Sequence, residues 1–167
     1  MLCNFFSLKE LNFGKLMDLY AEGNLKKARE EFSADDLNLG ILKAEQDFYL
    51  YLKDVFFTVD NALYCVWEEK GKYLSALRLE PYREGLLMEA LETHPDYRQM
   101  GYAKRLILEV LASLKNTGIT AVYAHVHKKN VASLQTHIAC GFQRVSEQAV
   151  YIDGSVNSFC CTMRYLL

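Results

Sequence analysis

The hydrophobic pattern of this chain changes near residue 60, and no other feature restricts its fold as strongly. From Leu11 to Phe57 apolar residues recur every three or four positions, which is the period of an amphipathic helix. This part predicts two helices, the first interrupted at Gly23-Asn24 and the second beginning after a capping segment, Ser33–Asp36. Beyond residue 60 the apolar residues form short runs typical of strands.

The second part of the chain mixes strands and helices in an order that indicates the architecture. Strands are predicted at 62–67, 73–80, 86–93 and 119–126, helices at 101–116 and 132–140, and a closing hairpin at 142–152 and 159–166. A strand that leads into a helix and back to another strand requires a crossover connection. The sequence therefore predicts an α/β fold, with one mixed, mostly antiparallel central sheet and helices on both faces. The length of 167 residues predicts a single domain, 1–167.

Composition and charge exclude several classes of partner. The net charge is −2, so the chain has no basic surplus to attract nucleic acid, and we expect no nucleic-acid partner. No apolar run approaches the ~20 residues of a membrane span, so no membrane partner is expected. The five cysteines show no Cys-x-x-Cys spacing, which favours reduced thiols and a cytoplasmic protein.

The segment that follows the strand at 86–93 has the composition of an anion site. A turn leads into the helix at 101–116, where Gly101 and the small Ala103 let a ligand approach the backbone. The first N–H groups of a helix have no partner within it, and they can therefore bind phosphate groups. Arg98 and Lys104 are the nearby cations. A tight loop without a ligand is the alternative interpretation of one glycine at such a turn.

Two separate motifs resemble those of the GNAT family of acyl-CoA N-acyltransferases. Arg98, Gly101 and Ala103 match the family pattern [Arg/Gln]-x-x-Gly-x-[Gly/Ala]. Asn130 and Ser133, followed by Gly141-Phe142, match a second pattern, Asn-x-x-[Ala/Ser] with a later Gly-Phe. The resemblance covers residues 60–167, which would form the acetyl-CoA-binding core. Residues 1–58 match nothing specific and would contribute to the acceptor site.

The resemblance implies a function and a set of binding residues. The protein would transfer an acetyl group from acetyl-CoA to a primary amine of a small molecule or peptide, by direct attack in a ternary complex. Leu91 and Thr93 would pair with the pantetheine arm, at a place where the sheet splays open, and Asn130 and Ser133 would lie nearby. The resemblance to the family also allows a homodimer. The pyrophosphate would be held by backbone N–H groups of the segment Gln99, Met100, Gly101, Tyr102, Ala103 and Lys104.

The family commonly places a tyrosine seven residues after the motif asparagine, as the acid that protonates the departing thiolate. In this chain that position is His137. A histidine can donate a proton as imidazolium or, more weakly, as a neutral N–H group, so the role remains chemically possible with a different pH dependence. Simple packing of His137 on its helix is the alternative.

An amine is mostly protonated at pH 7, so the reaction also needs a base. Strand alternation puts Val122, Ala124 and Val126 against the main helix, so His125 would face the other way, where it is the first candidate. Glu89 is the second, because it shares strand parity with Leu91 and Thr93, whereas its rival Glu92 does not. A structural histidine or a surface carboxylate is the alternative for each.

Other functions remain compatible with this sequence. His125, His127 and His137 could suggest zinc, but no carboxylate or cysteine has a companion spacing, so we expect no metal. Because the usual tyrosine is missing, a non-catalytic acyl-CoA-binding or sensing module is the main alternative to an enzyme. A structural domain that binds no coenzyme is the third possibility.

Overall fold

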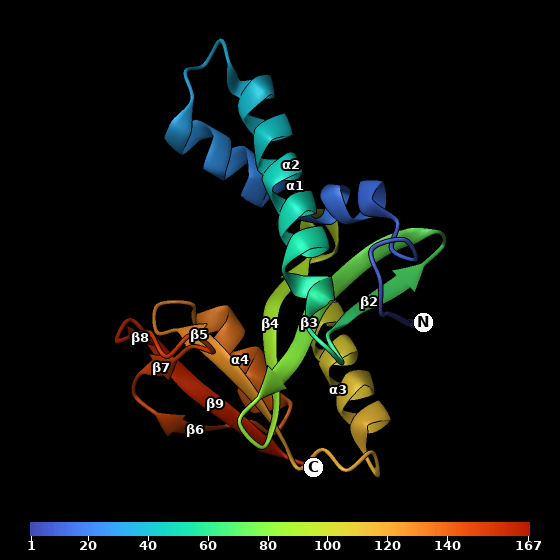
Figure 1. The fold of residues 1–167 in the computed structure, drawn as a ribbon, viewed down its shortest axis with the longest axis vertical. Coiled ribbons are helices and arrows are strands. Elements are labelled where there is room, and N and C mark those ends of the chain that lie inside the picture. The colour runs from blue at the N-terminus through green and yellow to red at the C-terminus, as the bar shows by residue number, and fades with distance from the viewer.

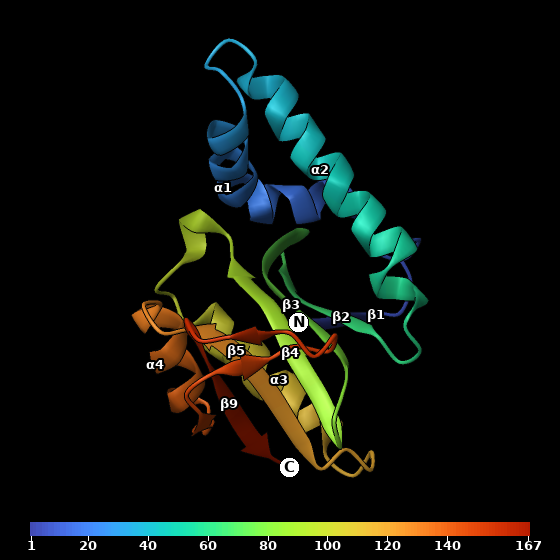
Figure 2. The same ribbon diagram turned by 60° about the vertical axis from the view of Figure 1, so that its left-hand side comes forward.

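The computed structural model describes residues 1–167, which form one large sheet with helices on both of its faces (Figures 1 and 2). The helices are α1 (Phe13–Glu31), α2 (Leu37–Asp54), α3 (Tyr102–Leu114) and α4 (Val131–Ala139). The strands are β1 (Leu2–Phe5), β2 (Leu63–Glu69), β3 (Lys72–Tyr82), β4 (Gly85–Thr93), β5 (Ala121–His127), β6 (Gln143–Ser146), β7 (Ala149–Val150), β8 (Val156–Asn157) and β9 (Cys160–Leu166). Short 3₁₀ turns lie at Phe56–Thr58 and Pro95–Tyr97.

The seven-stranded sheet has the order β1-β2-β3-β4-β5-β9-β6, and the expected fold class is confirmed. Only β4 and β5 pair in parallel, because α3 is the crossover between them. The last strand, β9, lies between β5 and β6 and pairs with both, so the expected closing hairpin is integrated into the sheet. β7 and β8 form a separate two-stranded sheet, and β1, which the sequence did not predict, extends the other edge.

The two faces of the sheet bury different groups of side chains. One face packs against α3, where Leu106, Ile107 and Val110 belong to the same buried cluster as Val122 and Ala124 of β5. This confirms the expected orientation of the alternating residues in β5. The opposite face packs against α1 and α2 through a second cluster that includes Leu16, Leu52, Phe56 and Tyr64.

Helices α1 and α2 form an arm that projects from the sheet (Figure 1). The predicted interruption at Gly23-Asn24 is wrong, since α1 continues through both residues. A glycine in an exposed helix interior costs only about 1 kcal/mol, and packing of α1 on α2 overrides that preference. The expected cap of α2 is present in altered form: Ser33 Oγ donates to Asp36 at 2.7 Å, while Asp36 makes no side-chain cap bond to the helix.

Candidate active site

The parallel pair β4–β5 separates partway along its length. The two strands pair only at Leu86–Val122, Leu87–Tyr123 and Met88–Ala124. Both strands continue beyond this point, β4 to Thr93 and β5 to His127. The facing edge of β4 after Met88 is therefore free to pair with an extended ligand.

A bulge in β4 lies immediately beyond the last pair. Ala90 has φ 51°, in the left-handed region that residues with a side chain seldom adopt. Across it, Arg78 of β3 faces Glu89 and Ala76 faces Glu92, so three steps on β4 match two on β3. The bulge thus adds one residue to β4 and reverses the side on which later residues lie.

Because of this bulge, the predicted orientation of Glu89 relative to Leu91 and Thr93 is wrong. Leu91 packs with the core under α3, and Thr93 Oγ1 lies 3.1 Å from Ser75 Oγ. Glu89, in contrast, is 3.7 Å from Arg78 Nη2, and the Arg78 guanidinium stacks on Tyr51 of α2. Glu89 therefore lies on the face opposite Leu91 and Thr93, and the parity argument in its favour was wrong. Simple alternation ends at a bulge, which no residue type in this strand announces.

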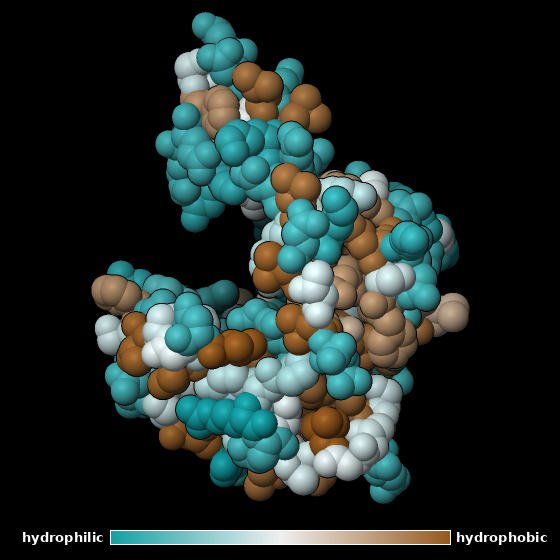
Figure 3. Space-filling model, in the orientation of Figure 1, coloured by the Kyte–Doolittle hydropathy of each residue, from teal (hydrophilic) through white to brown (hydrophobic).

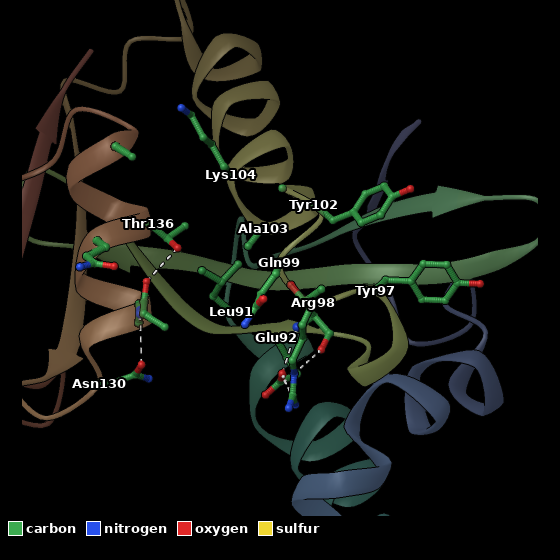
Figure 4. Close-up of a pocket in the computed structure, with 16 residues that line it drawn as sticks. Leu91, Glu92, Tyr97, Arg98, Gln99, Tyr102, Ala103, Lys104, Asn130 and Thr136 are labelled. Carbon is green, nitrogen blue, oxygen red and sulfur yellow. Dashed lines mark hydrogen bonds and ion pairs between the residues drawn. The ribbon is translucent and has the colours of Figure 1, made fainter.

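A large cleft of about 830 Å³ begins at the free edge of β4 and runs between α3 and α4 (Figure 4). All but one of the predicted cofactor-binding residues line it; the exception is Met100, whose side chain is 63% exposed. Those that line it are Leu91, Thr93, Arg98, Gln99, Gly101, Tyr102, Ala103, Lys104, Asn130 and Ser133.

The start of α3 gives this cleft its anion-binding character. Gly101 caps the helix with φ 82°, and Gln99 also has a positive φ of 61°. The first intrahelical bond of α3 is donated by Arg105 N to Gly101 O, so the N–H groups of the three preceding residues have no partner within the helix. No heavy atom lies within 4 Å of the place where a Gly101 Cβ would be. The backbone is thus open to a phosphate group.

The two predicted cations differ in their surroundings. Arg98 contacts Glu22 of α1 at 2.5 Å and Glu92 of β4 at 3.2 Å, and its Nε donates to Thr93 O at 3.3 Å. Lys104 forms no ion pair within the structure. A phosphate at this site would therefore find Lys104 free and would compete with two carboxylates for Arg98.

The second motif shapes the far side of the cleft. Asn130 caps α4 and its Oδ1 accepts a hydrogen bond from Ser133 N at 3.1 Å. This local bond fixes the start of α4 beside the gap between the strands.

A smaller cavity of about 170 Å³ lies in the gap between β4 and β5. It gathers the three predicted catalytic residues, Glu89 from β4, His125 from β5 and His137 from α4. Asn130 and Ser133 line both this cavity and the larger cleft, so the two spaces adjoin. Residues separated by almost 50 positions in the sequence thus meet where the strands part.

His137 is buried, with 3% of its surface exposed, and its ring is oriented by its own helix. Nδ1 lies 2.8 Å from Ser133 O, and because a carbonyl oxygen only accepts, Nδ1 carries the proton. Burial lowers the pKa of His137 below 6.5, although the bond to Ser133 acts in the opposite direction. The ring is therefore neutral at pH 7, with the lone pair on Nε2.

His125 stands between two aromatic rings, Tyr82 at 5.5 Å and Tyr151 at 5.1 Å, both edge to face. Its two ring nitrogens are buried and have no hydrogen-bond partner. Burial lowers the pKa of His125, while the charge of Glu89 raises it in part. The ring is neutral, and its nitrogens are enclosed rather than open to the cavity.

Sequence reasoning missed a charged cluster beside Glu89. Arg78 and Glu80 alternate with buried leucines in β3, which puts both on the face of Glu89. Burial and the neighbouring charge of Glu89 raise the pKa of Glu80 to about 7. The signal was present in the sequence, because charged residues that alternate with leucines on a central strand must face a polar site or a partner.

A hollow on the surface lies between the arm and the lobe that contains β7 and β8 (Figures 1 and 3). Several apolar side chains of the β7–β8 region are exposed, namely Ile152, Val156 and Phe159.

None of the helices is long and apolar enough to span a bilayer. No three His, Cys, Asp or Glu side chains are grouped so that they could hold a metal ion.

Comparison with known proteins agrees with this geometry. The chain resembles the PaiA N-acetyltransferase from Thermoplasma acidophilum in complex with coenzyme A, with TM-score 0.67, 14% identity, and coverage of 100% of this chain and 99% of that one. It also resembles the ribosomal-protein-S18-alanine N-acetyltransferase from Escherichia coli, with TM-score 0.61, 15% identity and coverage of 99% and 94%. No curated protein matches the sequence. Residues 25–142 match the acetyltransferase (GNAT) family, and the chain belongs to that family.

Proposed function

We propose that this protein transfers an acetyl group from acetyl-CoA to a primary amine of a small molecule or peptide by direct attack. The observation that carries the proposal is the continuous path from the open start of α3 to the cavity between β4 and β5. One end suits a pyrophosphate, the middle suits an extended pantetheine arm, and the other end holds titratable side chains. The solved PaiA structure with bound coenzyme A supports this choice of donor.

Backbone groups bind the coenzyme in this proposal. Backbone N–H groups between Gln99 and Lys104 hold the pyrophosphate, and the edge of β4 at Leu91 and Thr93 pairs with the pantetheine arm. The small net charge of the chain, −2, presents no obstacle, because unpaired helix N–H groups supply local positive potential. Lys104 adds a free cation at the same place.

Glu89 is the base that the structure favours over His125. The Glu89 side chain is 23% exposed and lines the cavity, whereas both His125 nitrogens are enclosed. In the proposed reaction the ammonium group loses one proton to the Glu89 carboxylate, and the neutral nitrogen then attacks the thioester carbonyl carbon. The C–N bond forms first, and the C–S bond breaks as the tetrahedral intermediate collapses.

The second nitrogen-bound proton must reach the departing sulfur, and His137 is the group that we assign to this transfer. Its neutral Nε2 accepts the proton, and the resulting imidazolium, whose pKa is lowered by burial, donates it to the CoA thiolate. The products are an amide and CoA thiol, and the proton on Glu89 leaves to solvent. His137 thus acts as acid only after it has first accepted a proton.

The test is release of free CoA thiol from acetyl-CoA in the presence of an amine panel, with CoA binding titrated in parallel. The alternative is a non-catalytic acyl-CoA-binding module, which the neutral rings of His125 and His137 and the missing tyrosine support. Binding of CoA without thiol release from any amine would favour that module. Thiol release that depends on an amine establishes the enzyme.

Substitution Glu89→Gln tests the base. We expect kcat/KM for the amine to fall about 100-fold, because a positioned base contributes at least that much. Affinity for CoA should change less than about twofold, since Glu89 is outside the coenzyme cleft. Glu109→Gln, an exposed change on α3, is the control. Unchanged kcat/KM in Glu89→Gln would remove this residue from the reaction.

A further inference from the structure

A hydrogen-bonded chain of two tyrosines connects the arm to the β4 bulge. Tyr20 of α1 donates from its hydroxyl group to the Ala90 carbonyl oxygen at 2.9 Å. The Tyr20 and Tyr64 hydroxyl oxygens are 2.9 Å apart, and because the Tyr20 proton is used at Ala90, Tyr64 is the donor between them. Tyr64, in β2, is fully buried. The Ala90 carbonyl group is thus fixed by a side chain from another part of the fold.

The position of this contact relates it to the proposed reaction. Ala90 is the residue with φ 51°, and it follows the last β4–β5 pair by two positions. It lines the small cavity together with Glu89 and Leu91. The conformation of Ala90 therefore decides where the free edge of β4 begins and how Glu89 and Leu91 are turned toward opposite faces. A left-handed conformation in a residue with a side chain persists only when its surroundings hold it.

The surroundings of Tyr20 make this contact rigid. Its ring packs edge to face on Phe48 of α2, with 5.3 Å between ring centroids. The enclosed hydroxyl group has its pKa raised by burial to about 12, so it remains a donor at any physiological pH. Both helices of the arm thereby contribute to the conformation of a strand that they flank.

We propose that Tyr20 is a positioning residue for the acyl group of the thioester and acts through the Ala90 carbonyl. The proposal rests on the proposed function, since it assumes that the thioester end of the coenzyme enters the cavity between β4 and β5. Without the Tyr20 hydroxyl the bulge relaxes, and the edge of β4 no longer fits the acyl end, while the distant pyrophosphate site is unaffected.

The test compares Tyr20→Phe with Tyr64→Phe. Each variant loses one hydroxyl group from the same buried chain, but only Tyr20→Phe loses the bond to Ala90. Calorimetry gives Kd for acetyl-CoA and for CoA, and neither measurement needs an acceptor amine. In Tyr20→Phe we expect acetyl-CoA to bind about fivefold more weakly, because the lost hydrogen bond from Tyr20 to the Ala90 carbonyl group no longer holds the strand edge beside the acyl group. CoA, which has no acyl group, should bind as it does to the wild type. Tyr64→Phe should lower Tm and leave the ratio of the two Kd values unchanged.

Each outcome decides the proposal separately from the enzyme assignment. A ratio of Kd values that is unchanged in Tyr20→Phe, or altered equally in both variants, overturns the role of Tyr20. If the wild type binds both ligands but acetylates no amine, the proposed function fails while the ratio still decides the role of Tyr20. With an acceptor in hand, kcat of Tyr20→Phe should fall while KM for acetyl-CoA changes by about the same fivefold factor as its Kd.

Discussion

Single charged and titratable residues in and beside the cavity between β4 and β5 owe their properties to burial more than to direct partners. Burial lowers the pKa of His125 and of His137, so both rings are neutral, and burial together with the charge of Glu89 raises the pKa of Glu80 to about 7. Arg78 is 12% exposed, and its Nε and Nη1 have no hydrogen-bond partner. Its guanidinium instead lies over the rings of Tyr51 and Phe56. Titratable groups with pKa values shifted in this way favour proton transfer at neutral pH.

Glu80 should make the stability of the protein depend on pH. Its pKa is raised from 4.5 to about 7, so the folded state binds a proton that the unfolded state has lost, and stability falls as pH rises between these values. Glu80→Gln imitates the protonated form. We expect it to raise the free energy of unfolding at pH 8 by about 1 kcal/mol, after allowance for solvent screening, and to have little effect at pH 4. Urea unfolding at both pH values measures this, and an equal gain at both would contradict it.

His137 should affect turnover more than binding. Because Nδ1 is engaged by Ser133, only Nε2 can accept and donate, and His137→Ala removes that atom. We expect kcat to fall about 100-fold, the usual contribution of a positioned acid or base. In His137→Tyr, a phenol that donates to sulfur should retain more activity than alanine. Since the wild-type ring must start neutral, its kcat should decline below pH 6.5, and the tyrosine variant should lose that decline. Equal turnover in wild type and both variants would exclude His137.

At the scale of elements, the site is made by the ends of β4, β5, α3 and α4 rather than by their middles. Helix α3 offers its free N–H groups only because the chain turns sharply at Gln99 and Gly101. Helix α1 contacts the segment just before α3 through the Glu22–Arg98 ion pair. The arm thus contacts β4 through Tyr20 and the turn before α3 through Glu22.

The start of α3 can be tested with a matched pair of glycines. Gly101 and Gly71 have similar positive φ values, 82° and 76°, and neither has a heavy atom within 4 Å of a built Cβ. Valine at either position should cost about 1–2 kcal/mol of stability from left-handed strain. Only Gly101→Val should also weaken CoA binding, by about tenfold, because a side chain then covers the helix N–H groups. Equal Kd values for CoA in the two variants would argue against this site.

At the scale of the whole molecule, the two ends of the β4–β5 pair differ in structure, and so do the two faces of the sheet. The pairing of β4 with β5 is close at one end and absent at the other, so the same pair of strands supplies both rigidity and the open gap. The face covered by α3 holds the larger core, and the face under the arm holds Arg78, Glu80 and Glu89.

Gly85 controls the closed end of this strand pair. A Cβ at Gly85 would lie 2.0 Å from the Ala121 carbonyl oxygen, which is backbone and has no flexible side chain to move. Gly85→Ala should therefore lower the free energy of unfolding by about 3 kcal/mol, as severe overpacking does. Gly23→Ala, in the exposed interior of α1 with nothing within 4 Å, should instead gain about 0.5–1 kcal/mol. Chemical denaturation compares the two, and a harmless Gly85→Ala would show that the strands can separate there.

The sequence by itself determined the order of the main strands and helices after residue 60, the position of Gly101 at the start of a helix, and the family, since these depend on local periodicity and on short motifs. Only the tertiary structure decided the rest. The bulge at Ala90, the reversal of Glu89, the tautomer of His137 and the insertion of β9 between β5 and β6 depend on register, burial and partners from distant parts of the chain. The local sequence of a strand does not specify which strand it will pair with, and the identity of a side chain does not specify how deeply it will be buried.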